Sequence, residues 1–371
     1  MSAEIIREAL VSISITKKLL GATVAAGVVL SLAACGQAPA DNPGADGGNG
    51  DKSDFSACIV SDAGGFDDKS FNQLSYEGTK KAADELGATF REAESNAETE
   101  YGPNIDNMVS EGCNAIVAVG FALSQATVDA AEANAETDFI LVDDAGGDSK
   151  PDNVKPLLYN TAEAAFLAGY MSAGYSKTGK VGTFGGMEFP TVTIFMDGFK
   201  QGVDHYNEKN GTSVAVVGWD GTTGSFTGGF EANQSAKTVA KNIIDQGVDV
   251  LFPVGGPIYQ SGLQAIKDSG KDIALIGADA DLFETDPTTA DFVLTSVLKA
   301  MDLSTYEAVM ASAEGEFDGE AYIGTLENEG VGIAPLHEFE SKVDAELVKK
   351  VAEIKQEIID GSITVTSYLD N

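Results

Sequence analysis

The chain has 371 residues, of which 43% are hydrophobic and 22% are charged, so its composition is that of a globular protein and not of a disordered or fibrous one. Its length suits two lobes better than one core. The formal net charge of −35 argues against a nucleic-acid partner, because phosphates would be repelled, and the scattered Asp and Glu residues are typical of a solvated acidic surface.

The amino terminus has the pattern of an exported lipoprotein. Lys17 and Lys18 precede an apolar run over Leu19–Leu32, and Leu32-Ala33-Ala34-Cys35-Gly36 reads as a lipobox. A membrane-spanning helix needs about 20 apolar residues, so this run is too short for one. We predict a signal peptide over residues 1–34 and a lipid on the thiol of Cys35. A signal without lipid and a short anchor helix are the alternatives.

Residues 35–54 form the predicted tether between the lipid and the folded domain. After Cys35 they are mostly Gly, Ala, Asp, Asn and Pro, which bury too little apolar surface to offset the entropy of ordering. No later segment is apolar for long enough to span a membrane. The expected location is therefore the extracytoplasmic face of a bacterial cell membrane, with the lipid as the attachment.

From Phe55 onward, short apolar runs alternate with amphipathic stretches, which predicts parallel sheets with helical crossovers. The runs that predict strands are 57–60, 115–119, 139–142, 180–184, 213–219, 250–254, 273–276 and 292–296. The stretches that predict helices include 76–86, 124–135 and a last one at 345–358.

Two cysteines remain beyond the lipobox. Cys58 opens the first predicted strand, and Cys113 directly precedes another strand that would be its neighbour in a doubly wound sheet. An exported protein can oxidise such a pair, so a Cys58–Cys113 disulfide is one expectation. Two buried free thiols are the other, because Cys packs well as a small hydrophobe. The spacing fits no metal site.

Glycines and carboxylates follow five of the predicted strands, in both halves of the chain. These strand ends read Ser61-Asp62-Ala63-Gly64-Gly65, Asp143-Asp144-Ala145-Gly146-Gly147, Gly185-Gly186, Gly255-Gly256 and Gly277-Ala278-Asp279. Ligands of doubly wound sheets bind beyond the carboxyl ends of the strands, where glycines let a ligand approach the backbone. Five such ends predict a binding cleft between two lobes.

The chain resembles the basic membrane protein family of lipoproteins, also called the purine-nucleoside receptor family. The motifs that carry the resemblance are Ser-Asp-Ala-Gly-Gly-Phe-Asp-Asp-Lys-Ser-Phe-Asn-Gln at 61–73, Ala-Phe-Leu-Ala-Gly-Tyr at 165–170, Lys-Val-Gly-Thr-Phe-Gly-Gly-Met at 180–187 and Val-Leu-Thr-Ser-Val-Leu-Lys at 293–299. The resemblance implies the type I periplasmic-binding-protein fold, in which two α/β lobes are joined by three crossovers. Lobe one would be 55–159 plus 300–318, and lobe two 160–299 plus 319–371.

The resemblance also implies a function and a partner. A monomer would bind guanosine, inosine or adenosine between its lobes and deliver it to the permease of an ABC importer, with no cofactor or metal. A receptor for a sugar or a signal molecule, or a surface adhesin, is the alternative on the same fold. Neither His205 nor His337 lies near a strand-end glycine loop, so no catalytic triad is indicated and an enzyme is not expected.

The ligand residues that the resemblance implies come from these motifs. Phe71 and Phe226 would stack on the base from the two lobes, with Phe230 as a substitute for Phe226. Asp62 and Asp68 would contact the base edge, unless Asp68 caps the following helix. The remaining members would bind the sugar, and they are Asp143 or its neighbour Asp144, Asp279 or Asp281, Lys299, and the backbone N–H groups of Gly255 and Gly256. Ile258 and Tyr259 would narrow the sugar end of the cleft.

Overall fold

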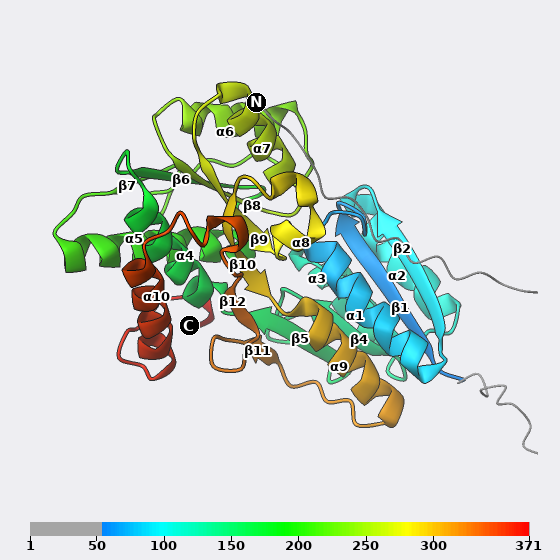
Figure 1. Ribbon diagram of the computed structural model, residues 1–371. Helices are drawn as coiled ribbons and strands as arrows, with labels where there is room; N and C mark the ends of the chain where they lie inside the picture. The colour runs from blue at the N-terminus through cyan, green and yellow to red at the C-terminus, as the bar shows by residue number, and fades with distance from the viewer. Residues whose placement is uncertain (1–53, 371) are drawn as a thin grey trace, which may run out of the picture. The chain divides into compact units, whose positions relative to one another are not determined.

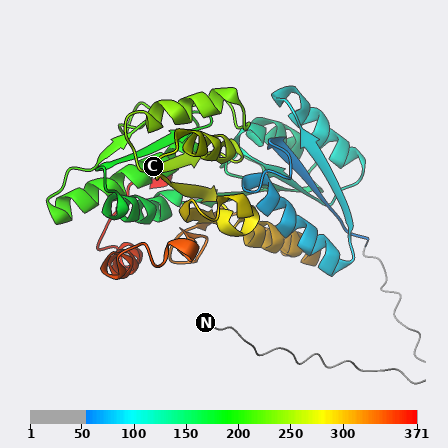
Figure 2. The ribbon, with the colours of Figure 1, turned by 45° about the horizontal axis from the view of Figure 1, so that its top comes forward.

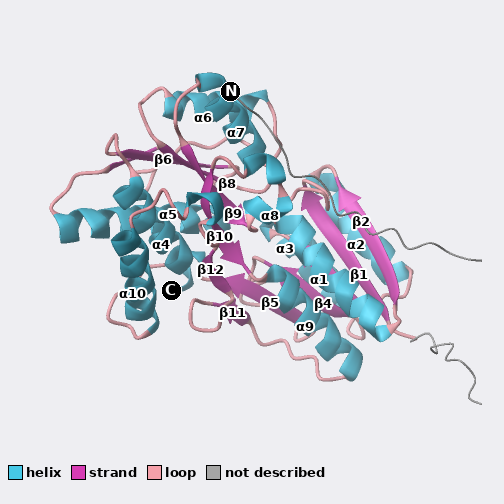
Figure 3. Ribbon diagram, in the orientation of Figure 1, coloured by secondary structure: helices cyan, strands magenta, loops and turns pink. Residues whose placement is uncertain are grey.

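The computed structural model describes residues 54–370, and they form two parallel-dominated sheets with helices packed around each (Figure 3). The predicted signal peptide, Cys35 and nearly all of the predicted tether lie outside these residues. Among residues 54–370, no helix has both the length and the apolar character that crossing a bilayer requires.

The first sheet is entirely parallel and has the strand order β11-β5-β4-β3-β1-β2. Its strands are β1 (Ser56–Ala63), β2 (Thr89–Ser95), β3 (Ala115–Val119), β4 (Asp138–Val142), β5 (Val154–Tyr159) and β11 (Tyr322–Gly324). The helices of this half, which we call lobe one, are α1 (Phe71–Leu86), α2 (Tyr101–Ser110), α3 (Ser124–Ala133) and α9 (Met301–Glu314).

The second sheet has the order β12-β10-β9-β8-β6-β7 and is parallel except for β12, which pairs antiparallel with β10. Its strands are β6 (Lys180–Gly185), β7 (Ala215–Val217), β8 (Val250–Val254), β9 (Ala274–Asp279), β10 (Val293–Lys299) and β12 (Val331–Ile333). The helices of this half, lobe two, are α4 (Thr161–Tyr175), α5 (Pro190–Asn210), α6 (Gln234–Ile244), α7 (Ile258–Ser269), α8 (Leu282–Thr285) and α10 (Ala345–Ile359).

The chain passes between the two sheets three times, which confirms the predicted fold class. The passages follow β5, β10 and β11, and the orange α9 consequently lies beside the blue α1, far from its neighbours in sequence (Figure 1). The predicted boundary at residue 319 was wrong, because β11 pairs with β5 in the first sheet. The third passage lies between Gly324 and Val331.

Close helix packing positions one wall of the space between the sheets. Helix α4 is buried nearly all round, and Gly169 on it faces the backbone oxygen of Phe199 on α5 so closely that a Cβ would collide. Without that side chain the two helices approach closely, and the first turn of α5 is held at the end of the second sheet. The final helix α10, red in Figure 1, packs on α4.

Within lobe one, the Sγ atoms of Cys58 and Cys113 are bonded as a disulfide, with the two Cα atoms 6.0 Å apart. Cys58 lies in β1, and Cys113 lies two residues before β3, which pairs with β1. The bond therefore ties together two neighbouring strands that both end at the cleft described next.

Candidate ligand-binding site

A cleft of about 540 Å³, including its open mouth, lies at the carboxyl ends of the strands. Eight of the nine predicted ligand residues line it: Asp62, Asp68, Phe71, Asp143, Gly255, Gly256, Asp279 and Lys299. Phe226 does not.

Lys299, the last residue of β10, joins the two lobes at the floor of the cleft. Its Nζ lies 2.6 Å from Oδ2 of Asp143 in lobe one and 3.7 Å from Oδ1 of Asp279 in lobe two, and its side chain is only 2% exposed. Three aromatic rings surround the same ammonium group, those of Phe71, Tyr159 and Phe195, with centroids 5.1–5.4 Å away. Burial of this charge is therefore offset by two carboxylates and three ring faces.

Asp143 and Asp279 occupy equivalent places in the two lobes, one directly after β4 and the other at the end of β9. Both have left-handed backbones, with φ of 67° and 68°, which is uncommon for residues other than glycine and is often found at functional sites. Burial raises the pKa of both carboxyls, and Lys299 opposes that rise. Ionised carboxylates only accept hydrogen bonds, so both suit a ligand with hydroxyl groups.

The two neighbouring carboxylates that were alternatives make other contacts. Asp144 accepts from the hydroxyl of Ser124 and from the backbone N–H of Gly146, and it lies outside the cleft lining. Asp281 accepts from the N–H of Phe283 at the start of α8 and pairs with Nε2 of His337 at 2.8 Å. Of each neighbouring pair, it is therefore Asp143 and Asp279 whose carboxylates face the cleft.

Asp68 lies at the cleft, as expected of a base-edge contact, and it also has the alternative role of capping α1. It lines the cleft, but its two oxygens already accept the N–H groups of Ser70, Asn72 and Gln73 at 2.9, 2.9 and 3.1 Å and the Nδ2 of Asn72 at 3.3 Å. These four donors use all the acceptor sites of a carboxylate. Asp68 thus caps α1 and has little capacity left for a ligand.

Asp62 and Asn72 each have an acceptor oxygen that is available to a ligand. Asp62 accepts one hydrogen bond, from Nδ2 of Asn72 at 2.8 Å. Asn72 is 2% exposed, and its Oδ1 accepts nothing from residues 54–370 although it is buried at the cleft. Its unpaired oxygen is a signal that sequence cannot supply.

Burial raises the pKa of Asp62 to about 7; the bond from Asn72 opposes the rise, and the nearby carboxylates of Asp68, Asp143 and Asp279 add to it. A carboxyl whose pKa is higher in the folded state favours folding below its unfolded value of 3.8 and loses that contribution as pH rises toward 7. We expect Asp62→Asn to reduce the fall in melting temperature of the ligand-free protein between pH 4.5 and 7.5. Thermal unfolding of both proteins at a series of pH values measures this change. If the melting temperature fell with pH equally steeply in the wild type and in Asp62→Asn, the expectation would be contradicted.

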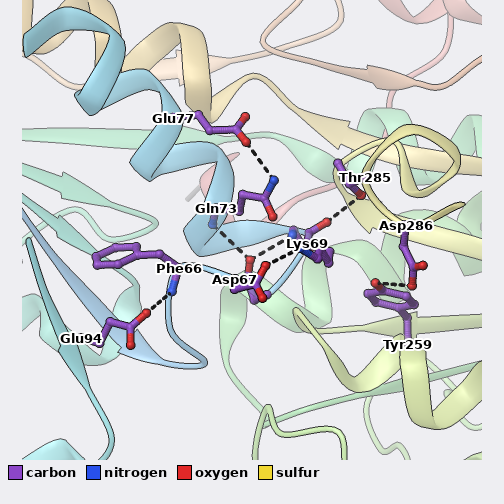
Figure 4. A network of polar contacts seen from close by, with 11 residues as sticks. Phe66, Asp67, Lys69, Gln73, Glu77, Glu94, Tyr259, Thr285 and Asp286 are labelled. Carbon is purple, nitrogen blue, oxygen red and sulfur yellow. Dashed lines mark hydrogen bonds and ion pairs between the residues drawn. The ribbon is translucent and has the colours of Figure 1, made fainter. Parts of the chain in front are cut away.

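The loop between β1 and α1 is fixed by polar contacts that turn its first residues away from the cleft. The N–H of Phe66 donates to Oε1 of Glu94 at 2.7 Å, and Asp67 forms an ion pair with Lys69 (Figure 4). Neither Phe66 nor Asp67 lines the cleft. After Asp62 and Ala63, this motif therefore faces the cleft again from Asp68 onward.

The prediction that Phe226 lines the cleft was wrong. Phe226 forms a β-bridge with Gly185, and its ring packs edge-on to Trp219, 6.2 Å away, and against Gly185. This bridge directs Phe226 into lobe two. Phe230, the substitute, lines the cleft instead, over Gly255, where a Cβ would lie 2.8 Å from its ring.

Sequence reasoning missed three further aromatic residues that line the cleft, namely Phe121, Phe189 and Phe195. Phe189 directly precedes α5, and its ring centroid lies 6.0 Å from that of Phe230 in the same lobe and 5.0 Å from that of Phe121 in lobe one. The available signal was Pro190, which marks a helix start after the strand-end glycines and so places Phe189 at the rim.

Ile258 and Tyr259 do not narrow the cleft, contrary to expectation. Both are buried in the core of lobe two, and the hydroxyl of Tyr259 donates to Oδ2 of Asp286 at 2.9 Å. Gly255 and Gly256 keep their expected place, with φ of 135° and 49° that favour glycine.

The family described as "ABC transporter substrate-binding protein PnrA-like" matches residues 55–368. The chain belongs to this family. Its resemblance to the basic membrane proteins is thereby confirmed, and its role is that of a solute-binding protein of an ABC transporter.

Relatives of this solute-binding protein cover most of its length. The "ABC transporter nucleoside-binding protein BmpA" of Lactococcus lactis is 29% identical over 85% of this chain and 90% of its own. "Basic membrane protein D" of Borreliella burgdorferi is 29% identical over 81% of this chain and 85% of its own. A solved solute-binding protein of Aeropyrum pernix is 27% identical, with a TM-score of 0.76 over 84% of this chain and 93% of its own.

Proposed function

We propose that this protein captures a purine nucleoside between its two lobes and delivers it to the permease of an ABC importer. The observation that carries the proposal is the composition of one cleft, in which aromatic rings from both lobes accompany acceptor-only carboxylates. Flat apolar rings suit a base, and carboxylates suit the vicinal hydroxyls of a ribose. The relative from Lactococcus lactis is named a nucleoside-binding protein, which supports the same class of ligand.

The proposed contacts follow from what each side chain has free. Phe71 of lobe one and Phe230 of lobe two stack on the two faces of the base. Asp62 and Asn72 lie where a base edge would reach, and each has an acceptor without a partner among the described residues. Asp143 and Asp279 accept from the ribose hydroxyls, Lys299 donates to a sugar oxygen, and Gly255 and Gly256 offer backbone N–H groups.

Closure of the lobes is part of this proposal. Lobe one would comprise 55–159 plus about 300–324, and lobe two the remaining described residues, with the three passages as hinges. Three hydrogen bonds connect these passages, from Asn160 N to Gly324 O, Ala300 N to Gly330 O and Leu326 N to Oε2 of Glu163. The ligand stabilises the closed state because only closure brings rings and carboxylates of both lobes onto it.

Attachment through Cys35 completes the proposal. The lipobox at Leu32–Gly36 and the Gly- and Asp-rich stretch that follows support a lipid-anchored protein on the outer face of the membrane, within reach of the permease. Mass spectrometry of the protein extracted from membranes distinguishes a lipidated Cys35 from an unmodified or uncleaved amino terminus.

A thermal-shift screen across nucleosides, bases and pentoses tests the ligand class. At a concentration one hundred times the dissociation constant, a bound ligand adds about 2.7 kcal/mol to the free energy of unfolding, which raises the melting temperature of a protein of this size by about 4 °C. We expect this shift with guanosine, inosine or adenosine and not with ribose. A shift with pentoses alone would favour a sugar receptor, and no shift with any nucleoside would contradict the proposal.

A further inference from the structure

Ser70 lies at the start of α1, is 1% exposed, and does not use its hydroxyl in the way its position suggests. A serine at a helix start commonly accepts a hydrogen bond from the N–H groups of the first turn. Here Asp68 accepts those N–H groups, and the side chain of Ser70 caps nothing. The hydroxyl of Ser70 is therefore free for another partner.

That partner is in the other lobe. Oγ of Ser70 lies 2.9 Å from the backbone oxygen of Ala278 and 3.2 Å from Oδ2 of Asp279, both in β9. A hydroxyl has one proton, so it donates to one of these acceptors at a time, and a bond to an ionised carboxylate is the stronger kind. Ser70 thus connects the loop before α1 to one of the strand-end carboxylates proposed to bind the ligand.

The contact is half of a reciprocal pair. Asp143 of lobe one is approached by a donor from lobe two, the ammonium of Lys299, and Asp279 of lobe two is approached by a donor from lobe one, the hydroxyl of Ser70. Lys299 also faces Asp279 from its own lobe, but at 3.7 Å. Each strained strand-end carboxylate is therefore oriented by a group that reaches it only when the lobes are together.

A second contact holds the same loop against lobe two. Oγ1 of Thr285, at the end of α8, donates to the backbone oxygen of Lys69 at 2.8 Å (Figure 4). Lys69 has a left-handed backbone, with φ of 62°, so the chain turns sharply just before Ser70. Figures 1 and 2 both show the yellow α8 beside the blue start of α1, as these contacts require.

We infer that Ser70 is a positioning residue that orients the carboxylate of Asp279 toward the ligand hydroxyls when the lobes close. The inference rests on the proposed function, since it takes Asp279 as an acceptor of sugar hydroxyls. Ser70 itself need not touch the ligand. Ser70 therefore affects the affinity for ligands whose sugar carries hydroxyl groups, and it leaves stacking of the base unchanged.

The consequence is a change in selectivity when the hydroxyl is removed. A hydrogen bond to a charged group is among the stronger kinds, so loss of an oriented acceptor should weaken hydroxyl recognition roughly tenfold or more. In Ser70→Ala we expect inosine to bind roughly ten times more weakly. The affinity for 2′,3′-dideoxyinosine, which has no hydroxyl to offer Asp279, should change little.

The experiment compares the ratio of these two affinities by calorimetry in the wild type, Ser70→Ala and Ser75→Ala. Ser75 is a matched control, since it is also buried in α1 but its hydroxyl donates to the backbone oxygen of Phe71 within the same helix. We expect the wild type and Ser75→Ala to prefer inosine, and Ser70→Ala to lose most of that preference. Ser70→Gly removes the hydroxyl a second way if the alanine variant does not fold.

The possible outcomes separate this inference from the proposed function. If the wild type binds inosine but Ser70→Ala keeps the same preference over the dideoxy compound, the role of Ser70 is wrong and nucleoside binding stands. The same holds if the wild type binds both compounds equally. If the wild type binds neither of them nor any other purine nucleoside, the proposed function fails and the inference fails with it. A merely structural role would weaken both compounds alike.

Discussion

Replacing Lys299 by methionine should lower the free energy of unfolding of the ligand-free protein by about 3–5 kcal/mol at neutral pH. The reason is the burial of its two partners, Asp143 and Asp279, which would keep their negative charge without the nearby ammonium group. Methionine retains most of the length and the packing against the rings of Phe71, Tyr159 and Phe195. The substitution therefore removes the charge of Lys299 with little change in packing. Urea denaturation measures the resulting change in the free energy of unfolding.

The loss of stability in Lys299→Met relative to the wild type should grow as the pH rises. Burial raises the pKa of Asp143 and Asp279 above 3.8, and without Lys299 both values rise further. A raised folded pKa means that stability falls as pH rises through the range between the unfolded and folded values. The stability of the variant should therefore come closer to that of the wild type as the pH is lowered toward 4, and fall behind it as the pH becomes neutral.

Lys241→Met is the matched control for this experiment. Lys241 also pairs with an aspartate, Asp245, but both side chains are more than half exposed on α6. Solvent screens an exposed pair, so it contributes little to stability, and this variant should stay close to the wild type at every pH. Equal stability of Lys299→Met and Lys241→Met at pH 7.5 would show that the buried carboxylates do not depend on Lys299.

Burial explains most of the strands that the sequence predicted, but β5 is buried and was missed, and β7 was predicted although it is not buried. Strands β3 and β8 have the predicted bounds, because a strand covered on both faces is a continuous apolar run. The edge strand β2 was missed, since its sequence Thr-Phe-Arg-Glu-Ala-Glu-Ser is mostly polar and its side chains are largely exposed. The three-residue strands β11 and β12 carry too short a pattern, and the misplaced third passage between the lobes followed from missing β11.

The strand ends also explain which site residues could be predicted. The carboxyl ends of parallel strands meet at the cleft, so Asp62, Asp143 and Asp279 could be expected there from the strand pattern and the family resemblance. The choice of Asp143 over Asp144 and of Asp279 over Asp281 needed the structure. Residues in irregular segments could not be placed in this way. Phe226 and Phe230 lie in one glycine-rich segment, and a single β-bridge to Gly185 determines which ring enters the cleft. Such a pairing joins residues far apart in the chain and leaves no local pattern.

Phe71→Ala and Phe230→Ala should each weaken binding of a purine nucleoside roughly 5- to 150-fold, because stacking of a base on an aromatic ring contributes about 1–3 kcal/mol. Both rings line the cleft, one from α1 and the other from the segment after β7. Calorimetric titration with inosine measures the loss. The same variants should bind ribose no differently from the wild type, since a pentose has no flat ring to stack.

Phe226→Ala separates stacking from a general loss of structure in this segment. Phe226 is four residues from Phe230, is also half-buried, and packs on Gly185 and Trp219 instead of lining the cleft. Its removal should lower the melting temperature while the affinity for inosine stays close to that of the wild type. If Phe226→Ala abolished binding and Phe230→Ala did not, the second stacking ring would be Phe226. The β-bridge to Gly185 would then have to open when the ligand binds.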